Sequence, residues 1–121
     1  MKNNNNLFDD LYNLAPDVER ICAPSEDELK VLRLKFYEHL PIMTTKLSKR
    51  QNDVLLHFYG YDMRQSEIAT ELDMYQSNVS TTLAKARSIL LSDFVLFFTA
   101  CIGGLRYGSE KEKILSDNMG V

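Results

Sequence analysis

Residues 65–87 read QSEIATELDMYQSNVSTTLAKAR, and this stretch contains two apolar patterns of helical spacing on either side of a short break. The break falls at Asp73-Met74 and contains neither Pro nor Gly. A tight break between two short helices is typical of a helix-turn-helix, whose second helix enters the major groove of DNA by its N-terminal end. The apolar positions expected to pack the two helices together are Ile68, Ala69, Leu72, Met74, Val79 and Leu83.

The outward-facing residues of the second helix are polar, and none of them is acidic. Gln and Asn side chains can form paired hydrogen bonds with adenine, and Ser or Thr hydroxyls can meet a base or a phosphate. We therefore predict that the base-reading residues are Gln76, Ser77, Asn78, Ser80 and Thr81. Basic side chains nearby can contact phosphates, which position a protein without reading sequence. The predicted phosphate contacts are Lys49, Arg50, Arg64, Lys85 and Arg87.

The first third of the chain predicts two further helices. Leucines at helical spacing favour a short helix over residues 7–14, which stops before Pro16. Ser25 and Glu28 have the spacing of a capping box, in which each side chain bonds the backbone N–H of the other residue. We expect the helix that begins there to end before Pro41, because a proline inside a helix removes a hydrogen bond and clashes with the preceding turn.

The remaining signals for helix starts and helix ends predict the other helices. Ser48 is expected to cap a helix that Gly60 ends, and Asp62 with Gln65 has the spacing of a second capping box. The last helix is long and apolar, and we expect it to end at Gly103-Gly104. The sequence therefore predicts an all-α fold of about five helices, with a central helix-turn-helix and a long apolar C-terminal helix.

The chain has 121 residues, the size of one domain, and a formal net charge of −3. Residues 1–45 hold 5 basic and 8 acidic side chains, whereas residues 46–87 hold 6 basic and 5 acidic ones. Any affinity for a polyanion must therefore come from a local surface and not from the net charge. We divide the chain into an acidic N-terminal helical extension (1–45), a helix-turn-helix domain (46–91) and an apolar helix with a polar tail (92–121).

The residue types argue against an enzyme, a metal site and a membrane span. The chain shows no nucleophile–base set and no Gly-rich phosphate loop, and its two cysteines, Cys22 and Cys101, lie 79 positions apart. We expect neither a cofactor nor a metal. The most apolar run, residues 94–102, is much shorter than the about 20 residues that cross a bilayer. A cytoplasmic protein without a membrane partner is the expectation.

Residues 47–90 resemble the helix-turn-helix of bacterial sigma factor region 4, and they are similar to the output domains of quorum-sensing and response regulators. The resemblance implies a bacterial or phage protein that reads DNA at a promoter. Over a shorter stretch, residues 75–83 also resemble the recognition segment of regulators of fimbrial operons. The positions that carry the main resemblance are Leu47-Ser48, Val54-Leu55, Glu67-Ile68-Ala69, Leu72, Asn78-Val79 and Ala86-Arg87.

Four features depart from the family pattern. Ser80-Thr81-Thr82 stand where sigma factors often have basic residues. Asp73 stands where the family has a Gly after the first helix, and Asp tolerates a left-handed backbone less well than Gly. Tyr75 replaces the usual small cap of the recognition helix. Arg64 replaces the Ser that usually caps the preceding helix, and Asp62 is expected to take over that cap.

These features predict a sequence-specific transcriptional regulator that binds double-stranded DNA. The weak positive charge of the middle segment predicts low affinity for one copy, and a homodimer that reads two half-sites doubles the contacts. The apolar C-terminal helix is the candidate dimer interface. The alternative for that helix is a core position, wrapped by the N-terminal helices. The predicted dimerisation residues are Phe94, Leu96, Phe97, Phe98 and Ile102.

A second function remains open from the sequence. The acidic chain and the lysine-poor second helix also fit a protein-interaction module of the same fold, which binds RNA polymerase, a sigma factor or another regulator. The acidic residues of segment 1–45 have two matching interpretations. They form either a solvated helical face or a regulatory surface, which docks a partner such as RNA polymerase or covers the DNA-reading helix and inhibits it.

Overall fold

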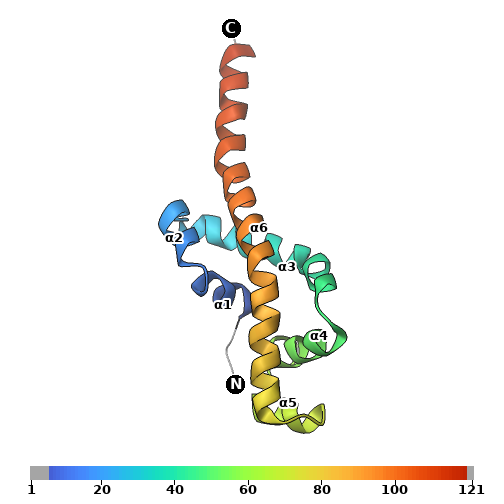
Figure 1. Cartoon of the computed structure of the whole chain (residues 1–121). Helices are drawn as coiled ribbons and strands as arrows, with labels where there is room; N and C mark the ends of the chain where they lie inside the picture. Colours follow the sequence, from blue (N-terminus) through green and yellow to red (C-terminus); the bar gives the residue numbers. More distant parts are fainter. Residues whose placement is uncertain (1–5, 120–121) are drawn as a thin grey trace.

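Helix α6 (Gln76–Met119) runs through the whole molecule as its central spine, and the other helices pack around it (Figure 1). The computed structural model describes residues 6–119, except for the side chains of residues 19, 21 and 108–119. The described residues form six α-helices and no strand, which confirms the all-α fold. The other elements are α1 (Leu7–Asn13), α2 (Pro16–Cys22), α3 (Glu26–Met43), α4 (Lys49–Leu55), α5 (Gln65–Glu71), a 3-10 turn η1 (Thr44–Lys46) and a π-helical turn η2 (Leu56–Gly60).

Both capping boxes that begin α3 and α4 have complete hydrogen bonds. The Glu28 N–H donates to Ser25 Oγ at 3.2 Å, and the Ser25 N–H donates to Glu28 Oε1 at 2.9 Å. Ser48 and Gln51 make the same pair of bonds at the start of α4. Because each cap involves residues only three positions apart, the local sequence is sufficient to fix these two helix starts.

Helix α2 was not predicted, because Pro16 was interpreted only as the end of the preceding helix. Pro16 is the first residue of α2. At that position the missing N–H costs nothing, and the fixed φ of proline already suits a helix. The same residue therefore separates α1 from α2 and begins α2.

The prediction that α3 ends before Pro41 is wrong, since the helix continues to Met43. Pro41 lies in the last turn, where the lost hydrogen bond affects only the helix end. Two threonine hydroxyls bond carbonyl groups of this turn: Thr44 Oγ1 donates to the Pro41 carbonyl at 3.2 Å, and Thr45 Oγ1 donates to the Ile42 carbonyl at 2.7 Å.

The prediction that α6 ends at Gly103-Gly104 is also wrong, because the helix continues to Met119. Neither glycine has a positive φ, and each is exposed with no atom within 4 Å of the place of a Cβ. Glycine weakens a helix by about 1 kcal/mol, which the rest of a long helix can compensate. The part of α6 beyond the glycines rises above the other helices (Figure 1).

The centre of the core is a cluster of phenylalanine rings from three helices. Phe8 of α1 meets Phe36 of α3 at 5.6 Å and Phe94 of α6 at 5.4 Å between ring centroids, both edge to face. Phe98 lies one helical turn beyond Phe94, with its ring centroid 5.7 Å away. All four rings are at most 1% exposed. Edge-to-face contacts add to the large apolar area that such rings remove from water.

One face of residues 94–102 therefore lies in the core and packs against the N-terminal helices, which was the alternative to a dimer interface. Phe94, Phe98 and Ile102 are buried within the chain itself. Phe97 is half-buried, and its ring stacks on His39 at 5.2 Å between centroids. Of the five predicted dimerisation residues, only Leu96 is exposed, with 68% of its surface accessible to solvent.

One ion pair joins the acidic N-terminal segment to α6, and another lies within the segment. Arg106 of α6 donates to both Glu28 carboxylate oxygens, at 2.9 and 3.0 Å, and to the Cys22 carbonyl at 2.7 Å. The hydrogen bonds from Arg106 and from the Ser25 N–H lower the pKa of Glu28 to about 2. Asp9 accepts a hydrogen bond from Arg33 at 2.8 Å. Part of the acidic charge in segment 1–45 is thus paired within the chain.

One described helix, α6 over Gln76–Tyr107, is long and apolar enough to cross a membrane by length and composition alone. The core helix of a soluble protein passes the same test. Only 22% of the apolar window is buried within the chain. Asp93, the one charged residue between positions 88 and 105, forms an ion pair with Lys46 at 2.8 Å. The helix therefore combines a buried face with an open face.

Two leucines of α3 test which face of that helix forms the core. Leu32 is fully buried, whereas Leu34 is 69% exposed. We expect Leu32→Ala to lower the free energy of unfolding by about 2–5 kcal/mol, because the change leaves a cavity. Leu34→Ala should change it by less than about 0.5 kcal/mol. Urea unfolding followed by circular dichroism measures both, and equal effects of the two substitutions would contradict this packing.

Candidate nucleic-acid interface

Helix α5 and the first turns of α6 form the helix-turn-helix that the sequence predicts. Ile68 and Ala69 of α5 are buried, and so are Val79 and Leu83 of α6. The small side chain of Ala69 allows the two helices to approach each other closely. The pair lies at the end of the molecule opposite the C-terminus (Figure 1).

The turn between the helices depends on a left-handed residue, Asp73, whose φ is 54°. The Met74 N–H donates to the Ala69 carbonyl at 2.8 Å, and the Leu72 N–H donates to the Ile68 carbonyl, also at 2.8 Å. Helices often end at a left-handed residue, most often Gly. The residue after it then donates its N–H to a carbonyl five positions earlier in the chain. Asp73 therefore occupies the backbone position for which the family uses Gly.

Arg50 of α4 supports this turn. Its Nη1 donates to the Leu72 carbonyl at 3.2 Å, which satisfies a carbonyl at the C-terminal end of α5. The side chain remains exposed, and a guanidinium has further N–H donors. Arg50 can therefore brace the turn and still contact a phosphate.

The predicted cap of α5 is wrong, because the capping residue is Arg64 and not Asp62. The Arg64 N–H donates to Glu67 Oε1 at 3.0 Å, so the glutamate of the family pattern bonds the cap backbone. Asp62 lies two residues earlier with a φ of 55°, inside the turn that follows η2. The Met63 N–H closes that turn on the His57 carbonyl at 3.1 Å.

The predicted base-reading residues share one open surface on the first turns of α6, and all of them are exposed. Thr81 Oγ1 donates to the Ser77 carbonyl at 2.9 Å, which orients its hydroxyl along the helix. The positive end of the helix dipole lies at the same surface. We name this set the reading surface: Gln76, Ser77, Asn78, Ser80 and Thr81.

The five predicted phosphate contacts fall into two groups. Lys49, Arg64 and Lys85 are exposed, as is Arg50. Arg87 is directed into the body instead: its Nε donates to the Tyr59 hydroxyl at 2.8 Å, and its guanidinium lies 5.8 Å from the centre of the Phe58 ring. This engagement makes Arg87 a brace between α6 and η2, and its role as a phosphate contact stays a prediction.

A network of side-chain hydrogen bonds joins the helix-turn-helix to the N-terminal helices. It was not predicted from the sequence. The Tyr59 hydroxyl accepts from Arg87 and donates to Asp10 Oδ2 of α1 at 2.7 Å. Burial, followed by the hydrogen bond to Asp10, raises the pKa of Tyr59 well above its ordinary value. The phenol is protonated at neutral pH and can donate its hydrogen bond to Asp10.

Within the described part of the chain, no three His, Cys, Asp or Glu side chains come together in a group that could hold a metal ion. The candidate site thus consists of a polar helix face, exposed basic side chains around it and a closely braced turn. This arrangement suits binding through hydrogen bonds and local charge.

The family model of sigma-70, region 4, matches residues 43–90. These residues therefore form a sigma region 4-like helix-turn-helix, in agreement with the resemblance found in the sequence. Sigma-70 region 4 is a DNA-binding, non-enzymatic domain family, and its members also bind RNA polymerase. The match covers η1, α4, η2, α5 and the first part of α6. No curated protein and no solved structure matches the chain.

The role of Tyr59 can be separated from that of a surface tyrosine. Tyr59→Phe removes the hydroxyl that Asp10 and Arg87 share, and we expect the free energy of unfolding to fall by about 1–3 kcal/mol. Tyr61→Phe is the matched control, because Tyr61 is 59% exposed, and its effect should stay below about 0.5 kcal/mol. Urea unfolding of the three proteins makes the comparison. If Tyr59→Phe is as stable as the wild type, the hydrogen bonds of the Tyr59 hydroxyl do not stabilise the fold.

Proposed function

We propose that the protein is a sequence-specific transcriptional regulator that binds double-stranded DNA and reads the major groove with the start of α6. The observation that carries this proposal is the reading surface, a polar helix face without a carboxylate in a chain of net charge −3. Such a face offers donors and acceptors to base edges. Lys49, Arg64 and Lys85 are exposed and supply the charge for the phosphates on either side.

The family match supports the same conclusion, since residues 43–90 resemble a domain that binds DNA. We also propose a binding protein without enzymatic activity, which acts in the cytoplasm of a bacterium or in a phage-infected cell. The ion pair between Asp93 and Lys46 and the burial of Phe94 and Phe98 support a helix α6 that serves as a protein core rather than as a membrane span.

A single copy should bind DNA weakly, because few exposed cations surround the reading surface and affinity grows with the number of neutralised phosphates. We therefore propose a homodimer through the open face of α6. Leu96 and Ala100 are exposed on this face, followed by Gly103 and Gly104. Small side chains permit a second helix to approach closely. This face replaces the predicted dimerisation surface, most of which lies in the core.

The geometry of such a dimer suits two half-sites. Asn78 and Ala100 are 22 positions apart, or about 33 Å along a helix. Two parallel α6 helices that cross at Ala100 at about 50° place their reading ends about 29 Å apart. This separation approaches the about 34 Å between half-sites one DNA turn apart.

One observation favours a second function, a protein-interaction module that binds RNA polymerase, a sigma factor or another regulator. Of the five predicted phosphate contacts, Arg87 is engaged within the body. Fewer free cations weaken the case for DNA and leave the polar helix face available to a protein. Binding to random duplex DNA at low salt separates the two functions, since only the first requires it.

The reading surface can be tested on sites selected from random DNA. Gln76→Ala and Ser80→Ala should each weaken binding to the selected site by about 1–3 kcal/mol and relax one base position. Lys85→Ala should weaken binding to all sequences alike and flatten the salt dependence. Fluorescence anisotropy at two salt concentrations measures both effects.

Arg20→Ala is the control, because Arg20 pairs with Asp17 on the surface of α2, away from the reading surface. It should leave affinity and salt dependence unchanged. Unchanged specific binding by both Gln76→Ala and Ser80→Ala would show that the assigned face is wrong.

The dimer proposal has its own test. Leu96→Glu places a charge on the open face of α6, and we expect the protein to remain folded and sediment as a monomer at micromolar concentration. Leu34→Glu is the control, because Leu34 is equally exposed on α3 (69% against 68%), and it should remain dimeric. Sedimentation velocity distinguishes the two states. A monomeric wild type at that concentration would contradict the dimer.

A further inference from the structure

Tyr75 is a large aromatic side chain at the start of the recognition helix, where the family usually has a small residue. It is 80% exposed, the highest value among the large hydrophobic residues that the structure describes. Its carbonyl accepts the N–H groups of Asn78 at 3.0 Å and Val79 at 3.1 Å. The backbone of Tyr75 is thus fixed by the first turn of α6, and its ring stands directly beside the reading surface.

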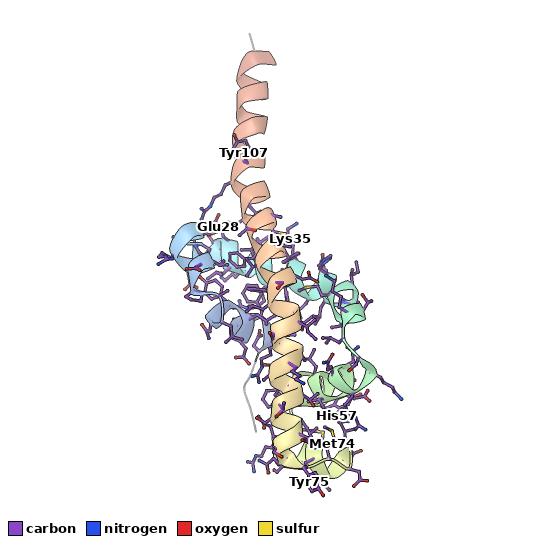
Figure 2. All side chains as sticks on the ribbon, viewed as in Figure 1. Glu28, Lys35, His57, Met74, Tyr75 and Tyr107 are labelled. Carbon is purple, nitrogen blue, oxygen red and sulfur yellow. The ribbon has the colours of Figure 1, made fainter. Side chains whose placement is uncertain are left out.

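The exposed ring is itself an apolar contact surface at the start of α6. Tyr75 borders a surface hollow whose wall also includes Met74 and the polar Asn78. Figure 2 shows Tyr75 and Met74 at the α5 end of the molecule. The charged residues that line the hollow are Arg50 and Asp73, whose opposite charges do not favour a phosphate. An apolar group that enters between Tyr75 and Met74 would bury ring surface that is otherwise in contact with water.

We propose that Tyr75 is a specificity-determining residue that reads the 5-methyl group of a thymine at one end of each half-site. The methyl group is the one apolar feature that the major groove presents, and apolar side chains read it by contact. All members of the reading surface are polar, so Tyr75 adds the apolar contact that they lack. This inference rests on the proposed DNA-binding function and adds to it a preference for thymine over uracil.

Replacement of each thymine by uracil in the selected site tests the inference, because only the methyl group is lost. Wild-type protein should bind about fourfold more weakly at one thymine position, the value of one buried methyl group. Tyr75→Ala should bind the thymine site about 10- to 100-fold more weakly than wild type, since a ring contact is lost. At that same position Tyr75→Ala should no longer distinguish thymine from uracil. Tyr75→Phe keeps the ring and should keep the discrimination.

Tyr107→Ala is the matched control. Tyr107 lies on the same helix, is 76% exposed, and is 32 positions or about 48 Å from Tyr75 (Figure 2). It should show wild-type affinity and wild-type discrimination. Thermal unfolding by circular dichroism should give the same midpoint for both alanine variants, because both side chains are exposed.

Three outcomes bear on the proposal. Wild-type discrimination in Tyr75→Ala would overturn it, and so would a wild-type protein that binds thymine and uracil equally at every position. If Gln76→Ala weakens specific binding while Tyr75→Ala does not, DNA binding stands and only the role of Tyr75 fails. If the wild type selects no site from random DNA, the proposed function itself fails, and the role of Tyr75 fails with it.

Discussion

The phenylalanine rings of α1, α3 and α6 meet at one place, and the arrangement of the whole chain depends on that contact. Phe8, Phe36, Phe94 and Phe98 lie almost completely out of water and touch edge to face or at a tilt. This packing holds α1 and α3 against the same helix that begins with the reading surface. Helix α6 therefore belongs both to the helix-turn-helix and to the core that it forms with the N-terminal helices.

The features that could be predicted from the sequence are those that depend on neighbouring residues. Ser25 and Ser48 cap their helices as expected, since each partner lies three positions away. The two helices on either side of Asp73 were also predicted, because apolar spacing alone defines their faces. Pro41 and Gly103 disagree with prediction because their local end signals are weak in context: Pro41 lies in the last turn of α3, and the long α6 compensates for the cost of Gly103.

Other features of the site could not be predicted, because they join distant parts of the chain. Arg87 has the same sequence signal as a phosphate-binding arginine, yet its guanidinium meets Tyr59, 28 positions away. Similarly, apolar residues on every side of residues 94–102 are compatible with a core or a dimer surface. Only the three-dimensional positions of α1 and α3 show that Phe94 and Phe98 belong to the core and leave Leu96 outside.

The continuity of α6 has a mechanical consequence. Gln76 lies 22 residues, or about 33 Å, from Phe98, so the helix acts as a lever whose pivot is the ring cluster. A tilt of about 6° at the pivot moves the far end by about 3.4 Å, which is the rise of one base pair. Small rearrangements among the phenylalanines would thus be magnified into a larger displacement of the reading surface.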